Sequence, residues 1–414
     1  YARGVSAEET RPQVIETGTA RPAGAGGLPP AREGTALYLH LPFCAAKCHY
    51  CDFFSVAAEG QDIEGLLAAV RREVELRAPR RPRTVFLGGG TPSLLSTAQL
   101  RELLEALERV TSFRDSAREV TVECNPESLS REKARALLDL GVNRFSIGFQ
   151  SLDDKTLELF GRVHSAEQSF RAYDAVRAAG ATNVNVDFIY ATPGQSLDAW
   201  RTTLERIVAI APEHVSAYNL TFEEQTPFRR WLEQGRLQKH TEDLELEFFH
   251  LTRERLVGAG IEPYEISNFA REGRACEHNL GYWRNNEYVG IGPSAVSKVG
   301  STRGGNVKSV GEYKRRIAHD GSAAAWDETP GDHARLGETW WLGLRLAEGL
   351  SAEQARERAG LSPCAADEDP ALVVARQLGA QGWLDERDGV WRTSARGLPL
   401  SDAIAREFLA LDSR

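Results

Sequence analysis

Three cysteines lie close together in a short polar segment that reads LPFCAAKCHYCDF. Cys44, Cys48 and Cys51 have the spacing C-x3-C-x2-C. Thiolates are soft, anionic ligands that suit iron–sulfur clusters and zinc. Three of them can hold one [4Fe–4S] cluster and leave its fourth iron open to the amino and carboxylate groups of a small molecule. The spacing therefore predicts a cluster with one iron available to a ligand.

A zinc site is the competing interpretation of the same cysteines. A closed structural zinc site needs four ligands, which usually come as two sequence pairs. The candidates for a fourth ligand are His40, His49, Cys124 and Cys276, and none of them belongs to such a pair. We favour the cluster and keep a zinc-stabilised interaction protein as an alternative.

Further polar residues follow predicted strands, where parallel sheets gather their binding groups. The run GGGTPS at Gly88–Ser93 lets the backbone approach a ligand closely. A carboxylate can accept hydrogen bonds from ribose hydroxyls, and an arginine can pair with a carboxylate. Glu123, Gln150, Arg162 and Asp187 have these types and positions. Taken singly, each is also explained as a capping or solvated residue.

Alternating apolar runs and amphipathic stretches must position these side chains. The predicted strands are 38–42, 84–87, 120–123, 144–147, 184–189 and 214–218. Apolar residues recur at helical spacing between them, and Ser96 with Gln99 predicts a capping box. Six βα units in a row indicate an α/β fold with a parallel sheet and helices outside it. We favour an open barrel over a doubly wound sheet.

The sequence divides into four predicted segments. Residues 1–34 are read as a flexible extension, residues 35–220 as the βα core, and residues 221–325 as a mixed α+β extension that contains EHNLGYW. Residues 326–414 combine helical patterns with the hairpin signal Asp388–Gly389. This pattern resembles a small winged-helix-like domain. Its net acidic charge favours an interaction or lid role over DNA binding.

Composition excludes several classes of protein. The net charge of −9 comes without a basic stripe, which argues against nucleic-acid binding. No apolar run reaches the length of about 20 residues that spans a bilayer. The first 34 residues contain no apolar core of a secretory signal. Closely spaced cysteines in such a chain suit a metal site in a reducing compartment, so we expect a cytoplasmic location.

The cysteine spacing after the first strand of a βα array resembles the radical SAM superfamily. The resemblance implies a partial (β/α)6 barrel, a [4Fe–4S] cluster on the three cysteines, and S-adenosylmethionine (SAM) on the open iron. In that superfamily the cluster reduces SAM and can release a 5′-deoxyadenosyl radical.

The motifs are also similar to the oxygen-independent coproporphyrinogen III oxidase-like family, over residues 36–410. Matching positions imply SAM contacts for these residues: Tyr38, Gly90, Thr91, Glu123, Gln150, Arg162 and Asp187. In the oxidase some of these positions contact a second SAM, so the number of SAM molecules that this chain binds, one or two, remains open.

Two branches of this family differ in function. The oxidase has a further cysteine two positions after the third ligand, where this chain has Phe53. EHNLGYW matches the HNxxYW motif of the HemW-type heme chaperones, which implies heme contacts for His278, Asn279, Tyr282 and Trp283. Imidazole and phenolate both occur as axial ligands of heme iron. Taken by itself, His278 is also explained as an ordinary hydrogen-bonded histidine.

We therefore favour a heme chaperone over a coproporphyrinogen III oxidase, and leave open whether the radical SAM scaffold also has an enzymatic activity. The chaperone's cargo would be heme and its partners heme-accepting apoproteins, with respiratory complexes as the family expectation. An oxidase that decarboxylates propionates, or a related tetrapyrrole enzyme, is the alternative. One departure concerns GIGPSAVS, where Val296 replaces the usual histidine and Ser294 a glycine, so heme binding is expected to differ or weaken.

Overall fold

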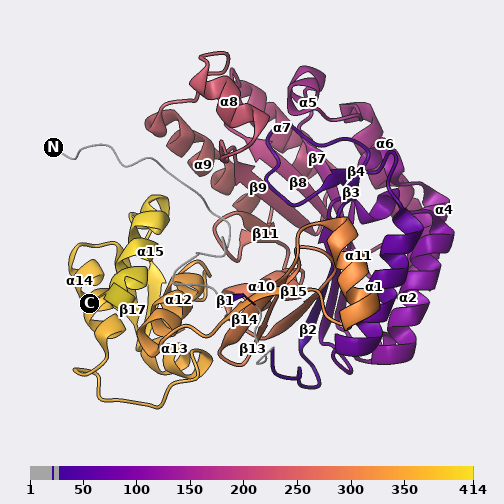
Figure 1. Cartoon of the computed structure of the whole chain (residues 1–414). Helices are drawn as coiled ribbons and strands as arrows, with labels where there is room; N and C mark the ends of the chain where they lie inside the picture. The colour runs from indigo at the N-terminus through magenta and orange to yellow at the C-terminus, as the bar shows by residue number, and fades with distance from the viewer. Residues whose placement is uncertain (1–20, 23–27, 414) are drawn as a thin grey trace.

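Six parallel strands form the centre of the protein, in agreement with the six predicted strands (Figure 1). The computed structural model describes residues 21–22 and 28–413. Side by side, the strands run in the order β2 (Ala36–Leu41), β5 (Thr84–Gly89), β6 (Glu119–Cys124), β7 (Arg144–Gln150), β8 (Val184–Tyr190) and β9 (His214–Asn219).

Helices follow these strands and cover the outer face of the sheet (Figure 1). The apolar faces of most of them pack on the buried strands in one continuous core, while α5 and α8 contribute Phe160 and Phe228 to a separate cluster. The capping box of Ser96 and Gln99 is present at the start of the second helix. The helices are α1 (Ile63–Arg77), α2 (Thr97–Thr111), α3 (Phe113–Ser116), α4 (Arg131–Asp139), α5 (Asp154–Phe160), α6 (Ala166–Ala178), α7 (Leu197–Ala209), α8 (Pro227–Glu233) and α9 (Glu242–Val257).

Added strands extend the sheet at both edges instead of closing it. The strand β12 (Tyr288–Ile291) lies parallel to β2. Beyond it follow β13 (Val296–Val299), β14 (Thr302–Asn306), β15 (Ala324–Glu328) and β1 (Arg21–Pro22), all antiparallel to their neighbours. At the other edge β9 pairs with β11 (Asn268–Ala270), which pairs with β10 (Glu262–Pro263). The expected partial barrel is therefore confirmed.

Two short segments complete the region that carries the motifs. The cysteine segment begins with β3 (Phe43–Cys44), which pairs with β4 (Val56–Ala57). The HNLGYW residues form α10 (Glu277–Trp283), and α11 (Val310–Asp320) packs beside α1. Most of the predicted flexible extension, residues 1–34, lies outside the described residues.

The C-terminal region has a small hydrophobic core of its own. Four helices, α12 (Asp332–Leu344), α13 (Ala352–Arg358), α14 (Pro370–Ala380) and α15 (Ser401–Leu409), surround a sheet of β16 (Leu350–Ser351), β18 (Val390–Thr393) and β17 (Leu384–Arg387). The predicted hairpin turn is present, and both Asp388 and Gly389 have positive φ.

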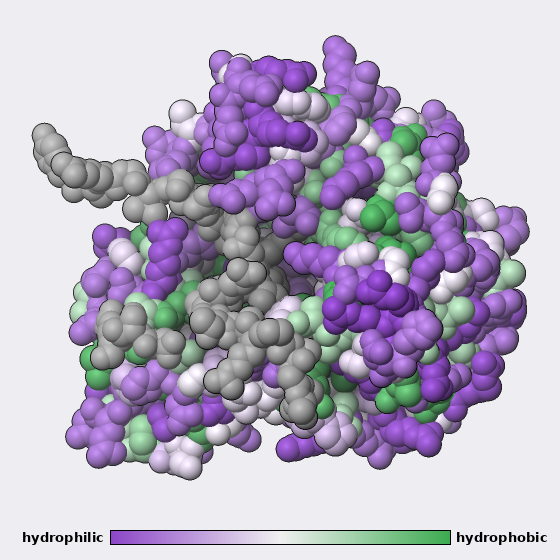
Figure 2. Space-filling model, in the orientation of Figure 1, coloured by the Kyte–Doolittle hydropathy of each residue, from purple (hydrophilic) through white to green (hydrophobic). Residues whose placement is uncertain are grey.

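Figure 2 shows one face of the protein, and polar and charged residues cover most of the coloured part of that face. Among the described residues, no helix combines the length and the apolar character that crossing a bilayer requires.

Candidate functional site

The two motifs lie at opposite ends of the barrel. The cysteine segment follows β2, the SAM candidates Glu123 and Gln150 lie at the carboxyl ends of β6 and β7, and the candidate Gly90 directly follows the end of β5. Helix α10 instead contacts residues at the amino ends, because its His278 bonds Thr84 and its first turn bonds Glu119. We call the first end the cysteine mouth and the second end the floor.

At the cysteine mouth, Cys44, Cys48 and Cys51 are all half-buried and none forms a disulfide. The Thr91 hydroxyl donates to Cys44 Sγ at 3.6 Å, and burial raises the pKa of the Cys44 thiol. Within the described ranges, no three His, Cys, Asp or Glu side chains are grouped as ligands of a single metal ion. A cubane has a different requirement, because each thiolate binds a different iron atom.

Two residues between the cysteines fasten this loop to the barrel wall. The backbone N–H of His49 donates to Phe160 O, and its ring Nδ1 donates to Leu159 O, both at 2.9 Å. Tyr50 packs against Phe160, with ring centroids 4.8 Å apart. His49 is therefore used in positioning the loop and is not placed as the fourth ligand of a zinc ion.

Arg162 connects the loop to the strand ends. Its guanidinium donates to the Tyr50 hydroxyl at 2.7 Å and to Asn125 Oδ1 at 3.0 Å. Asn125 in turn donates to Thr91 Oγ1 at 3.1 Å, so a continuous chain of hydrogen bonds reaches Cys44. Nearby negative charge outweighs burial and raises the pKa of Arg162, which keeps it cationic.

The sequence interpretation missed Tyr50 and Asn125. The signal for Asn125 is its position directly after the buried end of β6, in VECNPES. The signal for Tyr50 is an aromatic residue within a loop that is otherwise polar.

Glycines bring the end of β5 against the cysteine segment. A Cβ on Gly90 would lie 2.6 Å from the carbonyl carbon of Pro42, and one on Gly89, where φ is +105°, would meet the His40 ring at 2.6 Å. The Gly89 N–H donates to the Glu123 carboxylate at 3.0 Å. Only glycine permits this approach.

These observations fit a bound cluster and SAM. The mouth offers three clustered thiols, the cationic Arg162, and a buried Arg162 Nε without a hydrogen-bond partner. Buried donors of this kind usually bond a ligand or water. Gln150 also lies at this mouth, with a φ of +63° at a bulge in β7.

Two other SAM candidates lie deeper in the barrel. The Tyr38 hydroxyl bonds His40 Nδ1 at 3.0 Å. Because His40 Nε2 donates to the Phe54 carbonyl, its Nδ1 is the acceptor from Tyr38. Burial lowers the pKa of His40 to about 4, so this imidazole is neutral.

Asp187 ends a hydrogen-bond chain that runs through the barrel to the floor. Asn279 donates to the Tyr264 hydroxyl (3.1 Å), which donates to His214 Nε2 (3.0 Å). His214 Nδ1 donates to Asn185 Oδ1 (2.6 Å), and Asn185 donates to Asp187 (2.8 Å). Every donor points toward the carboxylate, an arrangement in which each bond polarises the next.

At the floor, His278 is buried and both of its ring nitrogens are used. Nδ1 bonds Thr84 Oγ1 at 2.8 Å, and Nε2 bonds the Tyr282 hydroxyl at 3.2 Å. The ring stacks on Phe86 and lies 6.4 Å from the Tyr38 ring, between centroids. Burial lowers the pKa of His278 to about 4.

Trp283 lies away from His278, under the C-terminal domain. Arg345 stacks on its ring at 4.3 Å, and Trp341 belongs to the same small apolar cluster. The indole N–H of Trp283 is buried without a hydrogen-bond partner.

Glu119 holds the start of α10. Its carboxylate accepts the backbone N–H groups of Glu277 and His278 at 2.8 and 3.2 Å, and the thiol of Cys276 at 3.1 Å. An acidic side chain here satisfies helix N–H groups that would otherwise be buried without partners.

Two residues of GIGPSAVS differ from the family pattern: Val296 lies in β13, and Ser294 lies just before it. Ser294 takes the left-handed conformation, with φ +65°, that glycine adopts most easily. Val296 is half-buried in β13, and Ser297 accepts the backbone N–H of Gly290 at 2.9 Å.

Comparisons with known proteins agree with this geometry. The chain matches the radical SAM superfamily over residues 38–207 and the HemN C-terminal domain over residues 332–400. It is 35% identical to the heme chaperone HemW of Bacillus subtilis, over 78% of this chain and 87% of that protein. It is 36% identical to the heme chaperone HemW of Mycobacterium tuberculosis, over 90% of this chain and 94% of that protein.

Among solved structures, coproporphyrinogen III oxidase (HemN) from Escherichia coli has the same fold. The two structures superimpose with a TM-score of 0.79 over 91% of this chain and 90% of the other, at 23% identity.

Proposed function

Because this chain belongs to the HemW family of radical SAM proteins, we propose that it is a heme chaperone that carries heme on α10 and a SAM-ligated [4Fe–4S] cluster at the cysteine mouth. The observation that carries the proposal is the complete HNxxYW segment, folded as one helix across the barrel floor. Its cargo is heme, and its partners are heme-accepting apoproteins. The cytoplasmic location expected from the sequence stays a prediction.

Cys44, Cys48 and Cys51 would hold the cluster, which supplies one-electron chemistry to SAM when both are bound. Arg162 and Lys47 bring positive charge close to these anionic ligands. The SAM contacts implied by the family for Tyr38, Gly90, Thr91, Glu123, Gln150, Arg162 and Asp187 are part of the proposal. Gln150 and Glu123 lie at strand ends where they can reach a ligand in the mouth.

His278 is the proposed iron ligand, and Asn279, Tyr282 and Trp283 are the other heme contacts that the motif implies. The Nε2 contact with the Tyr282 hydroxyl is longer than the Nδ1 contact with Thr84, at 3.2 against 2.8 Å. Iron binding at Nε2 would replace this contact while Thr84 keeps the ring oriented. The neutral state of His278 suits a metal ligand, since a protonated imidazole has no lone pair to donate.

Heme retention by variants tests the proposal. Protein is reconstituted anaerobically with cluster and SAM, mixed with heme, and passed over a sizing column while the Soret band is recorded. His278→Ala should lose at least about tenfold in heme affinity, as expected for one lost metal ligand. His319→Ala, at an exposed histidine of α11, should bind as the wild type does.

Tyr282→Phe separates the two possible ligands. If His278 binds the iron, removing the competing hydroxyl should leave heme affinity unchanged or raise it. Loss of binding in Tyr282→Phe together with retention in His278→Ala would assign the iron to Tyr282. Formation of protoporphyrinogen IX from coproporphyrinogen III, SAM and a reductant would overturn the chaperone assignment in favour of the oxidase.

A further inference from the structure

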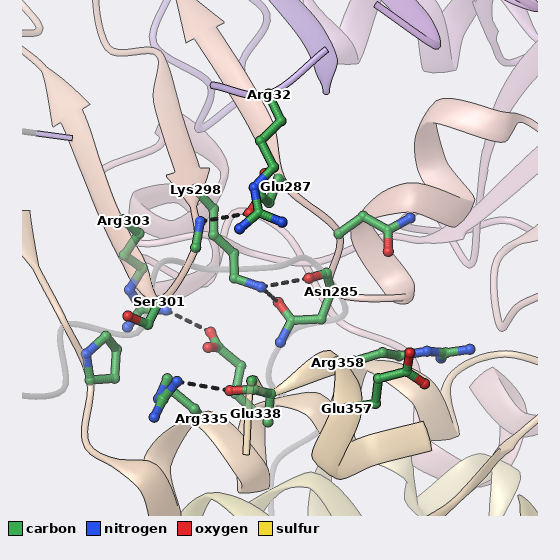
Figure 3. A pocket seen from close by; sticks show the side chains of 15 residues that line it. Arg32, Asn285, Glu287, Lys298, Ser301, Arg303, Arg335, Glu338, Glu357 and Arg358 are labelled. Atoms are coloured by element: carbon green, nitrogen blue, oxygen red, sulfur yellow. Dashed lines mark hydrogen bonds and ion pairs between the residues drawn. The ribbon is translucent and has the colours of Figure 1, made fainter. Parts of the chain in front are cut away.

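A polar pocket lies where the extended sheet meets the C-terminal domain (Figure 3). It encloses about 420 Å³. Its walls come from the loop after α10, from β13 and the start of β14, from the start of α12, and from the end of α13. Domain boundaries of this kind are common places for ligand sites.

Cationic side chains outnumber carboxylates in this pocket. The cations are Arg32, Lys298, Arg303, Arg335 and Arg358, and the carboxylates are Glu287, Glu338 and Glu357. Arg303 is the most fully neutralised of the cations, because it pairs with both Glu328 and Glu338. Arg335 pairs with Asp332, so the lining side chains outside these pairs are three cations and two carboxylates, a surplus of one positive charge.

Three of the cations have no carboxylate partner of their own. Among the described residues, Arg32, Lys298 and Arg358 form no ion pair. Lys298 Nζ donates instead to two neutral oxygens of Asn285, both at 2.5 Å (Figure 3). Burial lowers the pKa of Lys298 to about 8, which an anion nearby would reverse.

Two buried donors beside the pocket also lack partners. Arg335 uses its terminal nitrogens on Asp332 and on the carbonyl of Ala359, which leaves its Nε without a hydrogen bond. Arg358 Nη1 is likewise buried without a partner. Buried donors of this kind usually bond a ligand, an ion or water.

We propose that this pocket binds a small molecule with at least two anionic groups, either carboxylates or phosphates. Arginine binds both groups through paired N–H donors. The volume exceeds what one inorganic ion fills, and no aromatic side chain lines the pocket, so it does not offer a face for a macrocycle. The ligand would contact the barrel through Lys298 and the C-terminal domain through Arg358, and so would hold the two together.

Two sources supply this chemistry: a free polyanion, or the propionate pair at the edge of heme. The proposal does not rest on the chaperone function, because the first source needs no heme. Citrate and pyrophosphate serve as probes of the free anion. Heme and its dimethyl ester, which lacks the two negative charges, serve as probes of the second source.

Calorimetry and thermal unfolding of the full-length, heme-free protein test the site at constant ionic strength. Citrate or pyrophosphate should bind and raise the melting temperature. Arg358→Gln and Arg32→Gln should each weaken binding about tenfold, the usual loss for one charge-assisted contact. Arg376→Gln removes an equal charge from an exposed position on α14 outside the pocket and should bind as the wild type does.

Competition then separates the sources. If citrate displaces heme but not the dimethyl ester, the pocket takes the propionates. If citrate binds without displacing heme, the pocket takes a free anion. The proposal would be overturned if neither citrate nor pyrophosphate binds the wild type. It would also be overturned if each anion binds Arg358→Gln and Arg32→Gln as tightly as it binds the wild type, whether or not heme binds elsewhere.

Discussion

Arg162 links the two parts of the cysteine mouth. It lies between the loop that carries the thiols and the strand ends that carry the proposed SAM contacts, and it bonds both through Tyr50 and Asn125. The sequence interpretation gave this arginine only a carboxylate-binding role. The structure adds a positioning role, which spacing could not reveal because Tyr50 and Arg162 lie 112 residues apart.

Replacing Arg162 should damage both stability and cluster content. Arg162→Gln leaves the Tyr50 hydroxyl and Asn125 Oδ1 buried without their donor, which costs about 1–3 kcal/mol of unfolding free energy. Urea unfolding and iron per chain after reconstitution measure the two effects. Arg171→Gln breaks an exposed pair with Glu167. This control should change the free energy of unfolding by no more than about 0.5 kcal/mol and leave the iron content at the wild-type level. Full iron content in Arg162→Gln would refute the positioning role.

The buried His214 predicts a pH dependence of stability. Burial holds the pKa of His214 well below its ordinary value, so the folded protein keeps it neutral. The unfolded chain binds a proton there below about pH 6.5. The free energy of unfolding should therefore fall as the pH falls below 6.5, and be unaffected by this residue above that pH. His214→Gln should have a shallower slope of stability against pH between 6.5 and 5, and His319→Gln the slope of the wild type. Parallel slopes for all three proteins would contradict this.

At the scale of elements, the short helix α10 is held in place by the barrel and contributes little of its own stability. Isolated helices of this length are unstable in water. Its first turn depends on Glu119, at the start of β6, and the ring of His278 depends on Thr84, at the start of β5. The motif that identifies the heme chaperone branch is thus oriented by two residues that lie 158 and 194 positions earlier in the chain than their partners.

Glu119→Gln should loosen α10 while leaving the cysteine mouth intact. The amide keeps one accepting oxygen and places an NH2 donor where the other oxygen accepted the N–H of Glu277 or His278, so we expect a loss of about 1–3 kcal/mol. Hydrogen exchange should rise in residues 277–283, and heme affinity should fall with it. Glu108→Gln is the matched control, because Glu108 accepts a backbone N–H at the surface. Unchanged exchange in α10 would show that Glu119 does not hold it.

The strands and helices of the core were predictable from sequence because each has a local pattern of apolar residues: a short apolar run in a strand, and apolar residues at helical spacing in a helix. All six predicted strands are present within a few residues of their bounds. Strands β12 to β15 were not predicted, since they are short and rich in glycine and polar residues, as in TRGGN. Their pairing depends on contacts with β2 and β1 that no local pattern encodes.

At the scale of the whole molecule, the C-terminal domain contacts the barrel through charged and aromatic side chains. Arg345 on the domain pairs with the buried Glu265 of the barrel region and covers the ring of Trp283. Both members of this pair are almost fully buried, at 3% and 1% side-chain exposure. Removing one partner of such a pair costs more than the pair contributes, because the other charge stays buried.

Arg345→Ala should therefore destabilise the protein by about 3–5 kcal/mol and release the domain. Small-angle scattering should show a larger radius of gyration, and thermal unfolding should separate into two steps. The double variant Arg345→Ala with Glu265→Gln should recover part of the stability, because no buried charge is then left alone. A single cooperative transition at the wild-type temperature would contradict the docking role.

The place of β12 beside β2 also bears on how the protein is made on the ribosome. β2 starts at residue 36, but the neighbour on its outer edge ends only at residue 291. During translation that edge stays open while some 250 further residues emerge, and open edges recruit strands from other chains. Until β12 is synthesised, the strand that leads into the thiol loop therefore has one edge exposed to pairing with other chains.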